Sequence, residues 1–92
     1  FYDSPEIQYN VGLAHHNLGN YKEAIETYKN VLQSKPDWTG VHYNLGEAYL
    51  ALGNRIDAFD QYMILKNLDS DLAHKLYRLF NLYNLDVCLG NA

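Results

Sequence analysis

Apolar residues recur along the chain at intervals of three and four positions, the spacing of one face of an amphipathic helix. The first such segment runs from residue 5 to about 18, with its apolar stripe at Ile7, Val11, Ala14 and Leu18. Ser4 and Pro5 predict its start, because serine caps helices and proline suits the first helical position. Gly19-Asn20 predicts its end, since glycine accepts the left-handed backbone that terminates helices.

The same reasoning predicts four further helices, at about 21–34, 38–52, 55–68 and from about 72 onward. The second helix should end at Lys35-Pro36, because a residue before proline is pushed out of helical geometry. Asp37 is expected to cap the third helix, and the segment 69–71 is expected to cap the fifth. The turn at 53–54 repeats the Gly-Asn turn at 19–20. These features predict an all-α fold.

The predicted helices form two copies of one 34-residue pattern. When residues 5–38 are set above 39–72 without a gap, ten of the 34 positions are identical. The pairs are Tyr9/Tyr43, Asn10/Asn44, Gly12/Gly46, Ala14/Ala48, Leu18/Leu52, Gly19/Gly53, Asn20/Asn54, Ala24/Ala58, Tyr28/Tyr62 and Asp37/Asp71. A fixed period of this length is typical of helical repeat arrays. The small pairs, glycine 12/46 and alanine 24/58, are expected where the two helices of a unit cross closely.

The spacing of small, aromatic and apolar positions resembles the tetratricopeptide repeat (TPR) family. The first copy carries Val11-Gly12-x-x-His15, Ala24-x-x-x-Tyr28 and Pro36, and the second carries Leu45-Gly46-x-x-Tyr49 and Ala58-x-x-x-Tyr62. The chain departs from the family at Gln8 and His42 (often Trp), at His15 (Tyr) and at Ser70 (Pro). The resemblance covers residues from about 5 to about 84 and implies an α-solenoid of stacked antiparallel helix pairs.

We expect one domain over residues 1–92, with repeat one at 5–38 and repeat two at 39–72. Residues 73–89 are expected to form a partial third repeat or a capping helix. Because the chain starts with Phe1 rather than Met, we also expect it to be a piece of a longer protein.

The fifth helix is apolar on more than one face. Leu76, Leu79, Phe80 and Tyr83 are expected to pack back onto the second repeat. Four further apolar residues then have no partner within the chain: Leu82, Leu85, Val87 and Leu89. Val87 stands where a glycine turn is expected, so the helix should run on towards Gly90. Two interpretations stay open, a truncated array whose next helix covered this face, or a surface for self-association or a partner.

The charge balance argues against two classes of partner. The net charge is −4 without any basic run, so neither nucleic acid nor an anionic membrane is an expected partner. No apolar run reaches the ~18 residues that a membrane span needs, so we expect no membrane insertion. A single cysteine, Cys88, excludes an internal disulfide framework and does not identify a compartment. We expect a cytoplasmic protein.

The chain offers no set of residues with the spacing of a catalytic or metal site. His15 and His16 point to different helix faces, and His42 and His74 lie far off in sequence. Cys88 has no nearby histidine to act as its base. The glycines are explained by helix crossings and turns rather than by a phosphate-binding loop. We therefore expect no enzyme, no catalytic residue, no metal and no cofactor.

The resemblance implies that the first helix of each repeat lines a concave groove. Four rows recur along it every 34 residues: Tyr9, Tyr43 and Tyr77; Asn10, Asn44 and Arg78; Leu13, Glu47 and Asn81; His16, Leu50 and Asn84. Tyrosine offers rigid contact area with a polar tip, and amides both donate and accept hydrogen bonds. The tyrosines and asparagines also belong to the packing pattern of the family, so a purely structural interpretation stands beside the binding one.

Two sub-families sharpen what the resemblance implies. Asn44 and Arg78 match positions of the carboxylate clamp of chaperone-binding TPR domains. Tyr9, Leu13 and His74 occupy the remaining clamp positions, so two of three cations are missing and we do not expect chaperone binding. The chain is also similar to the asparagine rows of glycosyltransferase-type TPR superhelices, which implies binding of an extended peptide.

These observations favour a protein–protein interaction scaffold that binds a peptide or helix of a partner. The expected groove residues are Tyr9, Asn10, Leu13, His16, Tyr43, Asn44, Glu47, Leu50, Tyr77, Arg78 and Asn81. One alternative is an assembly domain that forms a homo-oligomer through Leu82, Leu85, Val87 and Leu89. A second alternative is a regulatory arm of a larger enzyme.

Overall fold

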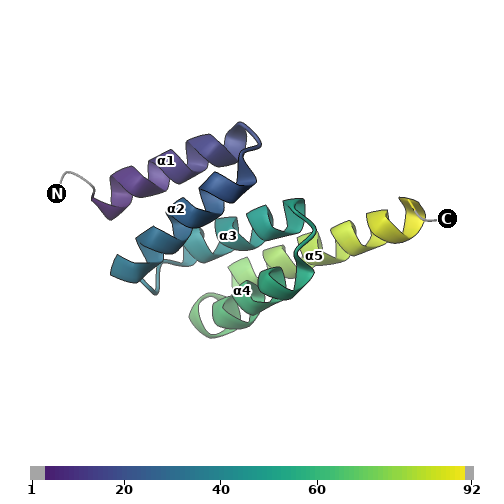
Figure 1. Cartoon of the computed structure of the whole chain (residues 1–92). Coiled ribbons are helices and arrows are strands. Elements are labelled where there is room, and N and C mark those ends of the chain that lie inside the picture. Colours follow the sequence, from purple (N-terminus) through teal and green to yellow (C-terminus); the bar gives the residue numbers. More distant parts are fainter. Residues whose placement is uncertain (1–3, 91–92) are drawn as a thin grey trace.

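The computed structural model describes the backbone of residues 4–90 and the side chains of residues 4–83. It contains five helices: α1 (Pro5–Asn17), α2 (Tyr21–Ser34), α3 (Thr39–Ala51), α4 (Arg55–Leu68) and α5 (Ser70–Gly90). In Figure 1, α1, α3 and α5 run in one direction, and α2 and α4 run back between them. Each helix packs against the next, and α3 also packs against α5. The expected all-α stack of antiparallel helix pairs is thereby confirmed.

Turn chemistry sets most of the helix ends where the sequence predicts them. The hydroxyl of Ser4 accepts a hydrogen bond from the Ile7 amide at 3.2 Å, and Pro5 is the first residue of α1. Gly19 and Gly53 adopt φ angles of +80° and +78°, in the left-handed region that glycine enters without penalty. The turns after α1 and α3 are therefore the same structure made twice.

Asp37 does not cap α3. The N-cap residue is Trp38, and it makes no side-chain capping bond. Instead, the Trp38 carbonyl accepts from the amides of Val41 and His42 at 3.1 and 3.2 Å. Because the helix begins one residue later than an Asp37 cap requires, the exposed carboxylate stands one position too early to reach the orphan amides of the first turn.

The predicted cap of α5 is present, but the helix starts at Ser70 rather than near Leu72. The Asp69 carboxylate accepts from the amides of Asp71 and Leu72 at 3.1 and 3.2 Å. The helix then continues unbroken to Gly90, as expected from the absence of a glycine turn at Val87. The division into two repeats and a partial third stays a prediction.

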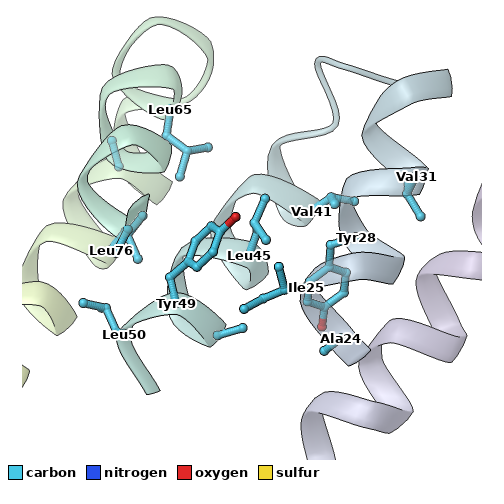
Figure 2. Close-up of a cluster of buried hydrophobic side chains, with 13 residues drawn as sticks. Ala24, Ile25, Tyr28, Val31, Val41, Leu45, Tyr49, Leu50, Leu65 and Leu76 are labelled. Carbon is cyan, nitrogen blue, oxygen red and sulfur yellow. The ribbon is translucent and has the colours of Figure 1, made fainter. Parts of the chain in front are cut away.

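The core lies between the layers of helices. Figure 2 shows Ile25 and Tyr28 of α2 facing Leu45 and Tyr49 of α3, with Leu76 on the far side. Ala24 and Ala58 are 0 and 1 % exposed, which agrees with their predicted place at close helix crossings. A Cβ atom added to Gly12 would stand 2.7 Å from the Tyr28 ring, so α1 and α2 approach too closely there for any side chain.

The two ends of the stack differ from its middle. The α1 stripe of Ile7, Val11, Ala14 and Leu18 is exposed, whereas the equivalent Val41, Leu45 and Ala48 of α3 are buried. At the other end, Leu76 is buried, and Leu79 and Phe80 pack against the core as expected. Leu82 is 55 % exposed. Leu85, Val87 and Leu89 lie outside the residues whose side chains are described, as does Asn84.

Candidate functional site

The predicted groove residues all come from α1, α3 and α5, and we call the surface they form the odd-helix face. Asn10, Tyr77, Arg78 and Asn81 are exposed there. Tyr9, Leu13, His16, Tyr43, Asn44 and Glu47 are partly buried. Leu50 is only 2 % exposed, because α3 turns this residue into the core. Leu50 therefore offers no surface to a partner in this arrangement.

Tyr9 joins α1 to α3. Its ring packs on Trp38 with centroids 4.8 Å apart, and its hydroxyl accepts a hydrogen bond from the side-chain amide of Asn44 at 2.5 Å. Burial raises the pKa of Tyr9, and the Asn44 hydrogen bond acts in the opposite direction. The tyrosine and asparagine rows are thus bonded to each other across the α1–α3 boundary. Trp38 was not among the predicted site residues.

His16 links α1, α2 and α3 through polar contacts. Its Nδ1 lies 3.0 Å from the Tyr28 hydroxyl, and its Nε2 lies 3.3 Å from a carboxylate oxygen of Glu47. A neutral imidazole satisfies both contacts when Tyr28 donates to Nδ1 and Nε2–H donates to the carboxylate. The Tyr28 side chain is fully buried, so the contacts run from the core through His16 to Glu47 and hold both side chains in place.

Tyr43 lies in the field of two opposite charges. Burial raises the pKa of its hydroxyl, the negative charge of Glu47 raises this pKa further, and the positive charge of Arg78 lowers it. The structure therefore brings one residue from each of three predicted rows into electrostatic contact. Glu47 and Arg78 carry single charges of opposite sign.

Tyr77 belongs to a different cluster. Its ring lies 5.2 Å from Tyr62 and stacks nearly parallel to Phe80 at 6.4 Å. The Arg55 guanidinium lies 4.3 Å from the centre of the Phe80 ring. Among the described residues, no ring contact joins Tyr9, Tyr43 and Tyr77 directly to one another. The three tyrosines of this row therefore do not form one aromatic stack.

A hollow of about 370 Å³ opens beside His16, and we call it the polar hollow. It is lined by His16, Asn17, Tyr21, Glu47, Ala51 and Tyr83. Sequence reasoning found His16 and Glu47 and missed the other four. Asn17 and Ala51 are the last residues of α1 and α3, and Tyr21 is the first residue of α2, so their meeting depends on the turn geometry. The 34-residue spacing makes Asn17 and Ala51 equivalent positions, but it does not show that they meet Tyr21 and Tyr83.

A larger hollow of about 540 Å³ lies at the α2–α3 turn and includes none of the predicted residues. Its lining consists of Glu6, Ser34, Lys35, Pro36, Asp37 and Trp38. The Lys35 ammonium and the Glu6 carboxylate lie 3.4 Å apart in it as an exposed ion pair. Glu6 and Lys35 already pair with each other, and the lining includes none of the predicted site residues, so we place the candidate site on the odd-helix face.

The described part of the chain contains neither a candidate metal site nor a candidate membrane-spanning helix. No group of three His, Cys, Asp or Glu side chains is arranged to hold a metal ion there. None of the described helices has the length and apolar character needed to cross a membrane.

Comparison with known families identifies the repeat. Residues 16–53, less than half of the chain, match the family model described as the TPR repeat. This match confirms the resemblance inferred from the residue pattern. No curated protein matches the chain significantly. TPR repeats generally mediate protein–protein interaction and are typically a non-enzymatic scaffold.

Proposed function

We propose that this chain, whose residues 16–53 match the TPR repeat model, binds a peptide or a helix of a partner protein on its odd-helix face. The observation that carries the proposal is the pair of side-chain contacts between α1 and α3. Asn44 holds the Tyr9 hydroxyl, and His16 holds the Glu47 carboxylate. Because these contacts are made between side chains of the chain itself, they hold α1 and α3 in a fixed arrangement, and a partner bears little cost of ordering the face.

Four exposed side chains on this face offer the partner complementary chemistry. Asn10 and Asn81 present amides that both donate and accept, which suits the backbone of an extended peptide. Arg78 presents a guanidinium, and Tyr77 presents a broad ring that is 42 % exposed. These four residues would contact the partner directly. The partly buried Tyr9, Tyr43 and Asn44 lie beneath them and support the surface.

A peptide selection followed by paired variants tests this proposal. Peptides would first be selected from a random displayed library on the 92-residue chain. The selected peptide would then be titrated against Asn10→Ala/Arg78→Ala and against Lys29→Ala/Asn30→Ala. Both pairs remove one exposed amide and one exposed cation, but Lys29 and Asn30 lie on α2. We expect the first pair to weaken binding about tenfold or more, and the second to leave it within about twofold.

Equal losses from the two pairs would contradict the proposal, as would a loss confined to the α2 pair. Thermal unfolding of each variant is the control, because all four positions are exposed and none is expected to change the free energy of unfolding by more than about 0.5 kcal/mol.

Self-association is the second candidate function, and the exposed ends of the stack favour it. Leu18 of α1 is 76 % exposed and Leu82 of α5 is 55 % exposed. If copies associate through α5, sedimentation equilibrium should show a mass that rises with concentration, and Leu82→Glu should reduce that rise. A monomer at every concentration would remove this candidate. The expected regulatory role in a larger enzyme stays a prediction.

A further inference from the structure

The polar hollow is shaped around one carboxylate. Glu47 points one oxygen at His16 Nε2 at 3.3 Å, and the Glu47 side chain keeps 35 % of its exposure. His16 is in turn held by the buried Tyr28 hydroxyl at 3.0 Å. This chain of contacts fixes the direction of the carboxylate and occupies only one of its two oxygens. A carboxylate accepts several hydrogen bonds, and Glu47 is part of the lining, so it can also accept from a ligand in the hollow.

Among the described residues, the lining of the hollow contains no lysine or arginine. Apart from Glu47, it presents the amide of Asn17, the rings of Tyr21 and Tyr83, the methyl group of Ala51 and the edge of His16. A positive charge brought into this hollow would therefore meet one full negative charge and no permanent positive side chain. An anion in the same place would be repelled by the Glu47 carboxylate.

The helix ends around the hollow favour the same sign of ligand. Asn17 ends α1 and Ala51 ends α3, and both residues are in the lining. The C-terminus of a helix carries a partial negative charge of roughly half a unit, and the N-terminus carries the reverse. Tyr21 begins α2, so one positive end stands against two negative ends.

Two tyrosines add the surface that a basic side chain prefers. Tyr21 is partly buried and meets the His16 ring edge-on at 5.4 Å, which fixes its orientation. Tyr83 lines the hollow from α5. Cations are attracted to the faces of aromatic rings, and the alkyl stems of lysine and arginine pack on apolar surface. A hollow of about 370 Å³ falls within the range of about 300–1,000 Å³ typical of ligand sites.

We propose that the polar hollow is a subsite for the cationic head of a lysine or arginine side chain of the partner polypeptide. This inference rests on the proposed function, since the hollow lies on the odd-helix face. The ammonium or guanidinium group donates to Glu47, and the stem of the ligand side chain lies against Tyr21. His16 is a positioning residue that holds the carboxylate.

Titration with single capped amino acids isolates the hollow from the rest of the face. N-acetyl-arginine amide and N-acetyl-lysine amide would be added to the labelled 92-residue chain while backbone amide chemical shifts are followed. N-acetyl-citrulline amide is the matched probe, because it keeps the shape of arginine without the charge. We expect saturable shifts at Asn17, Glu47 and Ala51 with dissociation constants on the order of 1 mM for the cations. Citrulline should bind about tenfold more weakly.

Two variants and one control complete the test. Glu47→Gln keeps a hydrogen-bond acceptor for His16 and removes only the charge, so arginine affinity should fall about tenfold. Tyr21→Leu removes the aromatic face, and affinity should fall about two- to fivefold. Glu26→Gln makes the same charge change at an exposed position of α2 that does not line the hollow, and affinity should stay unchanged.

Three results would overturn the subsite: no saturable shift with either cation, equal affinity for citrulline and arginine, or an unchanged affinity in Glu47→Gln. None of them bears on the proposed function, because the Asn10/Arg78 and Lys29/Asn30 variants measure peptide binding on residues outside the hollow. A peptide that depends on Asn10 and Arg78 but not on Glu47 would separate the two proposals.

Discussion

At the residue scale, Tyr28 connects the packing of the fold to the candidate site. Its side chain is fully buried at the crossing of α1 and α2, yet its hydroxyl reaches His16. Burial raises the pKa of Tyr28, and the nearby Tyr9 and the negative charge of Glu47 raise it further. An unfolded chain would release this proton near pH 10, the ordinary value for tyrosine.

The free energy of unfolding should therefore depend on pH above about 10. Above that pH the unfolded state binds fewer protons than the folded state, so stability falls as pH rises. The contribution is fully present below the ordinary tyrosine pKa and is lost as pH rises towards the raised one. Tyr9 and Tyr43, whose pKa values are also raised, add to the same trend. Denaturant titrations at increasing pH measure this slope.

Tyr28→Phe should flatten the slope and cost about 0.5–1.5 kcal/mol at neutral pH, because His16 Nδ1 loses its hydrogen-bond partner. Tyr62→Phe is the matched control at the equivalent position of the second repeat, where the hydroxyl makes no hydrogen bond among the described residues. An unchanged slope in Tyr28→Phe would show that Tyr28 is not the residue responsible.

The identity of a residue indicates its chemistry, but it does not indicate which residues it will contact. His42 has no metal-ligand spacing in the sequence, and the structure buries it in contact with the Gln61 side chain and the Pro36 carbonyl, both at 2.7 Å. The carbonyl lies in the turn before α3, so the Nε2–H donor of His42 ties that turn to the helix. Neither partner can be found from spacing, because the contacts depend on how the turn folds back.

At the element scale, the closeness of the helices is set by glycine. A Cβ atom at Gly12 would lie 2.7 and 2.9 Å from Tyr28 ring atoms, and one at Gly46 would lie 2.6 Å from a Leu76 methyl carbon. Gly40 of α3 differs, because its nearest neighbour would be 3.6 Å away. The first two glycines are required by packing, and the third is not.

We expect Gly12→Ala to destabilise the fold by ~1–3 kcal/mol, because the Tyr28 ring is buried and tied to His16 and cannot move aside. Gly40→Ala should instead stabilise it by about 0.4–1 kcal/mol, because alanine reduces the conformational freedom of the unfolded chain. Chemical denaturation of the two variants measures both values. Equal effects of the same sign would contradict this account of the α1–α2 crossing.

Helix boundaries show where local rules suffice. Ser4 and Asp69 cap helices as predicted, because each stands directly before a helix whose first amides it can reach. Asp37 has the same chemistry and does not cap, since the turn after Pro36 delays the start of α3 until Thr39. The order and type of the five helices could be predicted from the periodicity of apolar residues. The one-residue shift at the start of α3 could not be predicted in this way.

At the scale of the whole molecule, positions 34 residues apart on α1 and α3 have different surroundings. Val11 is 44 % exposed and its equivalent Leu45 is 2 % exposed, because α2 covers α3 but no described helix covers that side of α1. The apolar stripe therefore predicted a helix correctly without indicating whether it is covered. Coverage depends on the neighbouring helix, which the stripe itself does not specify.

The candidate site was partly predictable for the same reason. The 34-residue spacing placed Tyr9, Asn44, His16 and Glu47 on one series of helices, and the structure brings them into contact in pairs. The polar hollow was not predictable, because three of its residues stand at helix ends whose approach is set by the Gly-Asn turn. Repeat spacing identifies equivalent positions but not contacts at turns.

The most direct test of the account maps where a selected peptide binds on the whole chain. Backbone amide chemical shifts would be recorded for the labelled chain with and without the peptide. We predict that the perturbed amides of residues 4–83 gather on α1, α3 and α5, around Asn10, Glu47 and Arg78. Perturbations gathered on the exposed face of α2, around Lys29 and Asn30, would contradict the claim that the odd-helix face binds the partner.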